Sequence, residues 1–389
     1  MKKTYETTDM PKRVFLVGIH DADMNREEAD SLARELRGLS RTLGLAIVAQ
    51  EQVYIRKGHS QFGMGSGKAQ DLVQKAASLE ADCFIFDGDL RPSQQRNWET
   101  LSGIAAMDRQ ELILQIFASR ARTKEAGLQV ELASLAYALP RLQHKYLALA
   151  RQRGGRYGAK GQGETKRETD RRLVEQRLTR LQEELAVVRQ RRQVQRRKRE
   201  RRGIPTAALV GYTNAGKSSL LNAMTQADAL VEDKLFATLD PTTRQLILKD
   251  RRPLLLIDTV GFIRRLPHTL VEAFRSTLEE VSHADLLIQV LDASDPDVDR
   301  YFETTCSVLR ELGAQRLPMI TALNKIDQVA APETLEFLKQ RYAERSTASV
   351  LISAKHHTGM DALAQHIAGL LSTENARLRQ GCPLVPKVP

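Results

Sequence analysis

A short glycine-rich stretch in the middle of the chain carries the strongest chemical signal. "GYTNAGKSS" runs from Gly211 to Ser219 and fits the pattern G-x-x-x-x-G-K-[ST], in which glycines let backbone N–H groups approach phosphate oxygens. It follows the apolar run "AALV" and precedes the helix-like "SLLNAM". This is the order of strand, loop and helix that a phosphate-binding loop requires. The stretch therefore predicts a nucleoside-phosphate site.

The side chains of this loop have distinct expected tasks. Lys217 supplies a positive charge to the β- and γ-phosphates, and Ser218 offers its hydroxyl to Mg²⁺. The nucleotide is expected to contact the whole loop, which consists of Gly211, Tyr212, Thr213, Asn214, Ala215, Gly216, Lys217, Ser218 and Ser219.

A second motif follows an apolar strand forty-one residues after Lys217. "LLLIDTVGFI" places Asp258 at the end of this strand and Gly261 three residues later. A carboxylate there is suited to holding Mg²⁺ through water, and the Gly261 N–H can meet a γ-phosphate. We therefore expect Lys217 and Gly261 to act in catalysis, and Ser218 and Asp258 to hold the metal.

Two further motifs predict that the base is guanine. "NKID" spans Asn324 to Asp327 at the end of a strand, and "SAK" spans Ser353 to Lys355 after another. The Asp327 carboxylate can accept hydrogen bonds from guanine N1–H and the exocyclic amine, whereas adenine would leave it unpaired. Contacts from Asn324, Lys325, Asp327, Ser353, Ala354 and Lys355 are therefore expected in a GTP site.

The segment between the loop and Asp258, "DKLFATLDPTTRQ", should contain a threonine that closes over Mg²⁺ and the γ-phosphate. Thr238 is favoured as this metal-binding and catalytic residue, with Thr243 second and Thr242 also a candidate. Arg244 could act as an arginine finger in cis. The alternative, which we favour, is that Arg244 faces solvent or a partner.

The elements around these motifs predict an α/β protein. Residues 12–120 alternate apolar runs such as "RVFLVGIH" and "CFIFDG" with amphipathic stretches through Leu32, Leu72 and Trp98. This alternation is typical of βαβ units and a parallel sheet. "GMGSGKAQ" in this region lacks the first glycine and the hydroxyl of a phosphate loop, so we interpret it as a loop that opens a helix. The alternative is a second nucleotide site.

Two long helices are expected next. Apolar residues recur at spacings of three and four from Leu132 to Leu149, with Pro140 expected to kink or break the helix. Val174, Leu178, Leu181, Leu185 and Val188 then form a heptad seam. Because a short glycine-rich stretch, residues 154–163, joins the helices, the sequence predicts an antiparallel helical hairpin.

Positive charge is concentrated in this hairpin. Residues 151–202 hold nineteen Lys or Arg against seven Asp or Glu, a net charge of +12. The whole chain has a net charge of +11, so the remaining residues sum to −1. A solvated helix face is the simpler interpretation. The density favours polyanion binding, with expected RNA contacts at Arg153, Arg156, Lys160, Arg196, Arg197 and Arg199.

The expected domains are 1–125 (α/β), 126–202 (hairpin), 203–373 (nucleotide domain, a doubly wound P-loop fold) and 374–389 (tail). No apolar run approaches the ~20 residues that cross a bilayer, and the three cysteines have no metal-ligand spacing. We therefore expect a cytoplasmic monomer without a membrane span, with partial membrane association left open.

With these parts in order, the chain resembles the HflX family of ribosome-associated GTPases. The resemblance rests on "GETKRETDRRL", "GYTNAGKSSLLNAMT", "LFATLDPTTR", "DTVGFI" and "NKID". The hairpin motif of the family is closer to G-P-G-E-T-Q-L-E-T-D, so Gln162, Lys166 and Arg167 depart from it. The resemblance implies GTP-dependent binding to the large ribosomal subunit and its rRNA, and splitting or rescue of stalled ribosomes.

Two residues raise specific expectations. Phe262 stands where Ras-like enzymes have a water-orienting glutamine, so we expect slow intrinsic hydrolysis that the ribosome stimulates. The alternative is that Phe262 packs internally while another group orients water. Asn214 stands where some related GTPases hold K⁺, the alternative being an asparagine that only stabilises the loop.

Two other functions stay open at this point. A signalling switch could dock its basic helices on a protein or an acidic membrane. An RNA-remodelling NTPase would also use them, although "NKID" disfavours ATP as its fuel.

Overall fold

The computed structural model describes residues 12–379 apart from 57, 153–161, 202, 226–234, 237 and 266–279. At 142–152, 162–170, 189, 192, 195–201 and 373–379 it describes the backbone alone. Contacts divide the chain into two compact units, the first built on residues up to Ala186 and the second mainly on residues from Val187 onward. The three-domain division expected from the sequence stays a prediction.

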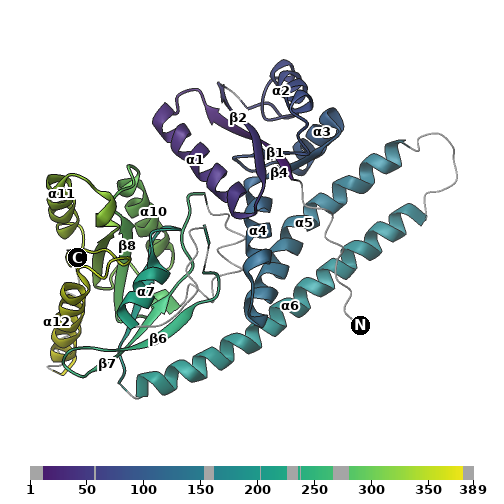
Figure 1. The fold of residues 1–389 in the computed structure, drawn as a ribbon. Helices are drawn as coiled ribbons and strands as arrows, with labels where there is room; N and C mark the ends of the chain where they lie inside the picture. The colour runs from purple at the N-terminus through teal and green to yellow at the C-terminus, as the bar shows by residue number, and fades with distance from the viewer. Residues whose placement is uncertain are drawn as a thin grey trace, which may run out of the picture. The chain divides into compact units, whose positions relative to one another are not determined.

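The first unit contains a four-stranded parallel sheet in the order β2-β1-β3-β4. Its helices α1 and α4 contact each other on one face, and α2 and α3 contact each other on the other face (Figure 1). The elements are β1 (Arg13–Asp21), α1 (Arg26–Thr42), β2 (Ala46–Ile55), α2 (Ser66–Ser78), β3 (Cys83–Phe86), α3 (Pro92–Ser102), β4 (Ala105–Asp108) and α4 (Arg109–Arg120).

The inner strands β1 and β3 of this sheet are buried on both faces, as expected when helices cover both. Phe15 and Val17 of β1 join a core with Trp98 of α3, whereas Val14 and Leu16 are buried on the opposite side. The βαβ pattern expected from the sequence is confirmed, and its parallel strands end together at one edge of the sheet.

Helices α5 (Lys124–Gln152) and α6 (Gln162–Arg201) form the predicted antiparallel hairpin (Figure 1). Leu181 and Leu185 of the expected seam are buried against Leu128. Lys124 pairs with Glu184 at 3.8 Å, and further along Glu131 pairs with Arg177 at 2.7 Å. Partner numbers fall along α6 as they rise along α5, so the helices run in opposite directions.

Pro140 lies inside α5 without ending it. Of the two outcomes expected at Pro140, a kink or a break, the break does not occur, and the helix continues to Gln152. Proline removes one N–H and one hydrogen bond from a helix. Pro140 itself is exposed.

The second unit contains a six-stranded sheet in the order β10-β9-β8-β5-β7-β6, parallel except for β6, which pairs antiparallel with β7. This is the doubly wound fold that the sequence predicts. The elements are β5 (Thr206–Val210), α7 (Lys217–Thr225), β6 (Thr242–Ile247), β7 (Pro253–Asp258), β8 (Leu286–Asp292), α10 (Val298–Glu311), β9 (Met319–Asn324), η1 (Ile326–Gln328), α11 (Pro332–Ala343), β10 (Ala348–Leu351) and α12 (Met360–Arg379).

Both faces of this sheet carry hydrophobic cores. Leu220 of α7 and Ile367 of α12 pack on one face, and Leu309 of α10 and Tyr342 of α11 pack on the other. Helix α12 ends at Arg379, six residues beyond the end expected for this domain. The strands β5, β7, β8, β9 and β10 all point their carboxyl ends to one edge, where the sequence motifs lie.

Candidate nucleotide site

The glycine-rich loop joins the end of β5 to the start of α7. Gly211 has φ +141°, and a Cβ there would lie 2.3 Å from the Val290 carbonyl oxygen. Gly216 has φ +93°, and its Cβ would lie 2.2 Å from Asn324 Nδ2. Both positions require glycine because the backbone turns in a left-handed region and passes close to its neighbours.

Lys217 is buried at the start of α7 and holds the loop. Its Nζ donates to the carbonyl oxygens of Tyr212 at 2.8 Å and Gly211 at 3.2 Å. Burial lowers the pKa of Lys217 to about 8, with the nearby Asp258 carboxylate opposing this effect. A desolvated ammonium gains from an anionic partner, so the group is suited to contacting phosphate oxygens.

Three oxygen-bearing side chains meet beside this lysine. Ser218 Oγ donates to Asp258 Oδ2 at 2.6 Å, Thr238 Oγ1 donates to the same oxygen at 2.9 Å, and the two hydroxyls are 2.6 Å apart. The sequence predicted this set of metal ligands, and the structure brings all three together. Thr243 instead lies exposed on β6, opposite Ile257.

Asp258 has one oxygen left over. Its Oδ1 is buried and makes no hydrogen bond within the described residues. Burial raises the pKa of Asp258, while Lys217 and the two hydroxyls act against this shift. Because Mg²⁺ prefers hard oxygen ligands and retains several waters, two hydroxyls and a carboxylate with a spare buried oxygen fit this ion.

Asn324 links the base-recognition motif to the phosphate loop. Its Nδ2 donates to the Ala215 carbonyl at 2.9 Å, and its Oδ1 accepts from the Ala354 N–H at 3.0 Å. Three segments that are far apart in sequence, the loop, "NKID" and "SAK", are therefore fastened by one buried amide. Ala354 is itself buried, whereas Lys355 is exposed.

Asp327 and Lys325 both have ordered partners. Ser353 Oγ donates to Asp327 Oδ1 at 2.5 Å, and this hydrogen bond is the main cause of the lowered pKa of Asp327. Lys325 Nζ pairs with Asp292 Oδ2 at 2.7 Å. Asp292 was missed by the sequence reasoning, and its position at the end of β8 was the only available signal.

Gly261 lies directly against the phosphate loop. A Cβ there would lie 2.8 Å from Thr213 Cα and 2.9 Å from Lys217 Nζ. The Phe262 N–H donates to the Gly211 carbonyl at 3.1 Å, and the Thr213 N–H donates to the Phe262 carbonyl at 2.9 Å. Backbone bonds thus place the glycine of the D-x-x-G motif beside the lysine, as the sequence predicts.

The Phe262 side chain points away from this site into the core. It is 1% exposed and packs among Ala208, Val210, Val281, Leu287, Val308 and Leu309. The Phe262 side chain therefore packs internally, as the second of the two expectations stated. A phenyl ring has neither a hydrogen-bond donor nor an acceptor for a water molecule.

Tyr212 makes contacts that its position in the loop did not reveal. Its ring stacks on Tyr301 of α10 with centroids 4.0 Å apart, and its hydroxyl accepts from the Arg264 N–H at 2.9 Å. Tyr212 and Tyr301 are about ninety residues apart in the sequence, so no local pattern predicted that their rings would stack. The stack joins the phosphate loop to α10, and the hydrogen bond joins it to the segment after Phe262.

The remaining predicted residues divide into described and undescribed ones. Thr213 is buried, Ser219 is half-buried, and Asn214 is exposed with φ +62°. Arg244 is exposed on β6. Arg153, Arg156 and Lys160 lie outside the described residues, as do the side chains of Arg196, Arg197 and Arg199.

The "GMGSGKAQ" stretch of the first unit opens α2, with Gly65 preceding its first residue. Phe62, where a phosphate loop would have glycine, is buried and lies 5.5 Å from the Trp98 ring. Ala69 is fully buried. Both substituted positions serve the core, as the interpretation of a helix-opening loop requires.

Comparison with known proteins gives consistent matches along the chain. The family described as "GTP-binding GTPase N-terminal" matches residues 30–118, and "GTP-binding GTPase Middle Region" matches 120–199. The family described as "50S ribosome-binding GTPase" matches residues 206–325. The three matches follow one another in the order of the elements described above.

Several relatives carry the name GTPase HflX. One from Akkermansia muciniphila is 48% identical over 83% of this chain and 76% of its own length. One from Lacrimispora saccharolytica is 42% identical over 98% and 88%, and one from Escherichia coli is 43% identical over 82% and 74%. A solved GTP-binding protein from Sulfolobus solfataricus in complex with GDP is 24% identical, covering 93% of this chain and 99% of its own, with a TM-score of 0.49.

Proposed function

The chain belongs to the GTPase HflX family of GTP-hydrolysing enzymes, and we propose that it binds the large ribosomal subunit and uses GTP to split or rescue stalled ribosomes. The observation that carries the ribosomal part is the +12 charge of residues 151–202. Such a segment is self-repulsive until a polyanion neutralises it. We place the monomeric protein in the cytoplasm, and no described helix is long and apolar enough to cross a membrane.

In the proposed site, the loop Gly211–Ser219 holds the phosphates and the groups near Asn324 and Ser353 hold guanine. Lys217 places its charge on the β- and γ-phosphates, and Gly261 offers its N–H to the γ-phosphate. Asp327 accepts from the guanine edge, and its hydrogen bond from Ser353 keeps the carboxylate charged.

Ser218, Thr238 and, through water, Asp258 would hold Mg²⁺, since their oxygens already converge within 2.9 Å of one another. When bound, this ion neutralises the charge that develops on the β- and γ-phosphate oxygens. K⁺ is a second proposed ion, for which Asn214 is the candidate ligand in the exposed part of the loop.

Hydrolysis is proposed to be slow without a partner. Phe262 is turned into the core and cannot orient a water molecule. The ribosome would supply the missing group, and partners contribute ~10³–10⁵ in rate in related systems.

The test is GTP turnover with and without purified large ribosomal subunits, in potassium and in sodium buffer. We expect a large stimulation by subunits and faster turnover in potassium, with Lys217→Ala inactive under all conditions. Normal GTP binding without stimulation would reject the ribosome as activator. Equal turnover in the two buffers would reject the potassium site.

Co-sedimentation separates the alternatives. Binding to intact ribosomes that is lost after RNase treatment supports the proposal. Binding to acidic vesicles instead would favour a signalling switch, and strand separation with ATP would favour an RNA-remodelling enzyme.

A further inference from the structure

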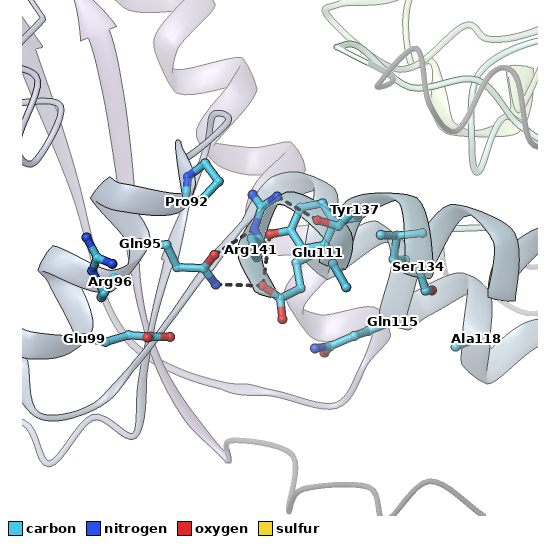
Figure 2. Close-up of a pocket in the computed structure, with 12 residues that line it drawn as sticks. Pro92, Gln95, Arg96, Glu99, Glu111, Gln115, Ala118, Ser134, Tyr137 and Arg141 are labelled. Atoms are coloured by element: carbon cyan, nitrogen blue, oxygen red, sulfur yellow. Dashed lines mark hydrogen bonds between the residues drawn. The ribbon is translucent and has the colours of Figure 1, made fainter. Parts of the chain in front are cut away.

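The first unit contains a cavity that the GTPase site does not use. It has a volume of about 350 Å³ and lies where α3, α4 and α5 meet (Figure 2). Sites for small ligands start at roughly 300 Å³ and combine apolar walls with a few polar groups. Leu114 and Ala138 contribute apolar wall, while Glu99, Glu111 and Gln115 contribute polar groups.

Arg141, one of the two arginines that line the cavity, already has protein acceptors. Arg141 donates to Gln95 Oε1, to the carbonyls of Tyr137 and Leu90, and to Asp108 Oδ2, the last at 2.8 Å. The Asp108 carboxylate is fully buried beside it and neutralises its charge. Arg141 therefore has little left to offer an anionic ligand.

Glu111 is held by one oxygen only. Gln95 Nε2 and the Tyr137 hydroxyl both approach Glu111 Oε2 at 3.1 Å. No hydrogen bond to Glu111 Oε1 occurs within the described residues. Figure 2 shows this second oxygen without a dashed line, between Glu99 on one side and Gln115 on the other.

Gln115 adds a second free acceptor one helical turn after Glu111 on α4. Its Oε1 is buried and has no hydrogen-bond partner in the described part of the chain. Buried acceptors without a partner are costly and uncommon. Because the cavity offers acceptors and a carboxylate beside an apolar wall, the matching ligand carries N–H donors and positive charge.

We propose that this cavity binds a small organic cation of the amine or amidine class. The N–H groups of the ligand face Glu111 Oε1 and Gln115 Oε1, and its apolar body lies against Leu114 and Ala138. Burial, with the neighbouring Asp108 second, raises the pKa of the Glu111 carboxyl. A cation would offset both effects. The site is independent of the proposed ribosomal role.

The test uses three probes with the same ring and different charge: benzamidine, benzyl alcohol and benzoate. Titration calorimetry on the full chain should give benzamidine a dissociation constant on the order of 1 mM, as expected for so small a ligand. Benzyl alcohol should bind at least about tenfold more weakly and benzoate not at all. Equal binding of the three probes would overturn the proposal.

Three variants locate the binding. Glu111→Gln and Gln115→Leu should each weaken benzamidine binding by roughly tenfold, and Ala138→Phe should abolish it by filling the cavity. Glu80→Gln, an exposed carboxylate elsewhere in the unit, is the matched control and should bind as the parent does. Circular dichroism checks folding, and Gln115→Leu leaves the Glu111 hydrogen bonds intact. Unchanged binding in the folded variants would overturn the proposal.

Discussion

At the scale of single residues, the Ser353 hydroxyl has a role that the sequence did not reveal. Its hydroxyl donates to Asp327 and lowers the pKa of that carboxyl. Ser353→Ala should therefore weaken GDP binding by roughly tenfold, because the carboxylate loses its orientation. Fluorescence titration with labelled GDP measures this. Ser349→Ala, which removes a buried hydroxyl of β10 without a hydrogen bond in the described residues, should bind GDP normally; equal losses would contradict the prediction.

The buried position of Phe262 leads to a prediction about its replacement. Phe262→Gln places an amide in a core position that is 1% exposed, so we expect a loss of unfolding free energy of about 3 kcal/mol. It should not accelerate turnover in the absence of ribosomes. Denaturant unfolding and single-turnover assays measure both effects. Phe337→Gln, at a position 59% exposed, is the control, and a stable, fast Phe262→Gln enzyme would refute this view.

Sequence spacing predicted most of the nucleotide site but not its supports. Glycine, lysine and aspartate motifs have fixed offsets because phosphate geometry fixes them, so Gly211, Lys217 and Asp258 could be found in the sequence. Asp292 and Tyr301 support the site from other elements. Their distance along the chain depends on the tertiary fold, which no local pattern encodes.

At the scale of elements, the α5–α6 hairpin depends on a short buried seam. Leu181→Ala removes a fully buried side chain from the contact with Leu128 and should cost about 2–4 kcal/mol. Leu173→Ala, at a position 57% exposed on the same helix, should change stability little. Hydrogen exchange of the helix amides measures the difference. Equal protection in both variants would show that the seam does not stabilise the hairpin.

The same hairpin shows the limits of periodicity. The three-and-four spacing predicted the buried face correctly, since Leu181 and Leu185 lie on it. It could not tell whether α5 continues through Pro140 or breaks there, because the cost of a proline inside a helix depends on its tertiary surroundings.

At the scale of the whole molecule, the fold class followed from the sequence because alternating strands and helices leave few solutions. The parallel sheet of the first unit, the doubly wound fold of the second and the antiparallel pair of helices were all expected. The boundary between the two compact units, after Ala186, was not expected from the sequence. It lies inside α6, which continues from the first unit into the second. A boundary between two units that falls inside a continuous helix does not change the amino-acid composition there, so composition cannot predict it.

The charge of residues 151–202 leads to the last prediction. Replacing Arg196, Arg197 and Arg199 together by Gln should weaken ribosome binding. With fewer phosphate contacts, binding releases fewer counterions from the RNA. The slope of log affinity against log salt should become shallower by roughly 0.7–0.9 per contact. Co-sedimentation across a salt series measures it. The control removes the same charge from exposed positions, Arg26, Arg251 and Arg316; if it changes the slope equally, net charge rather than the basic hairpin determines binding.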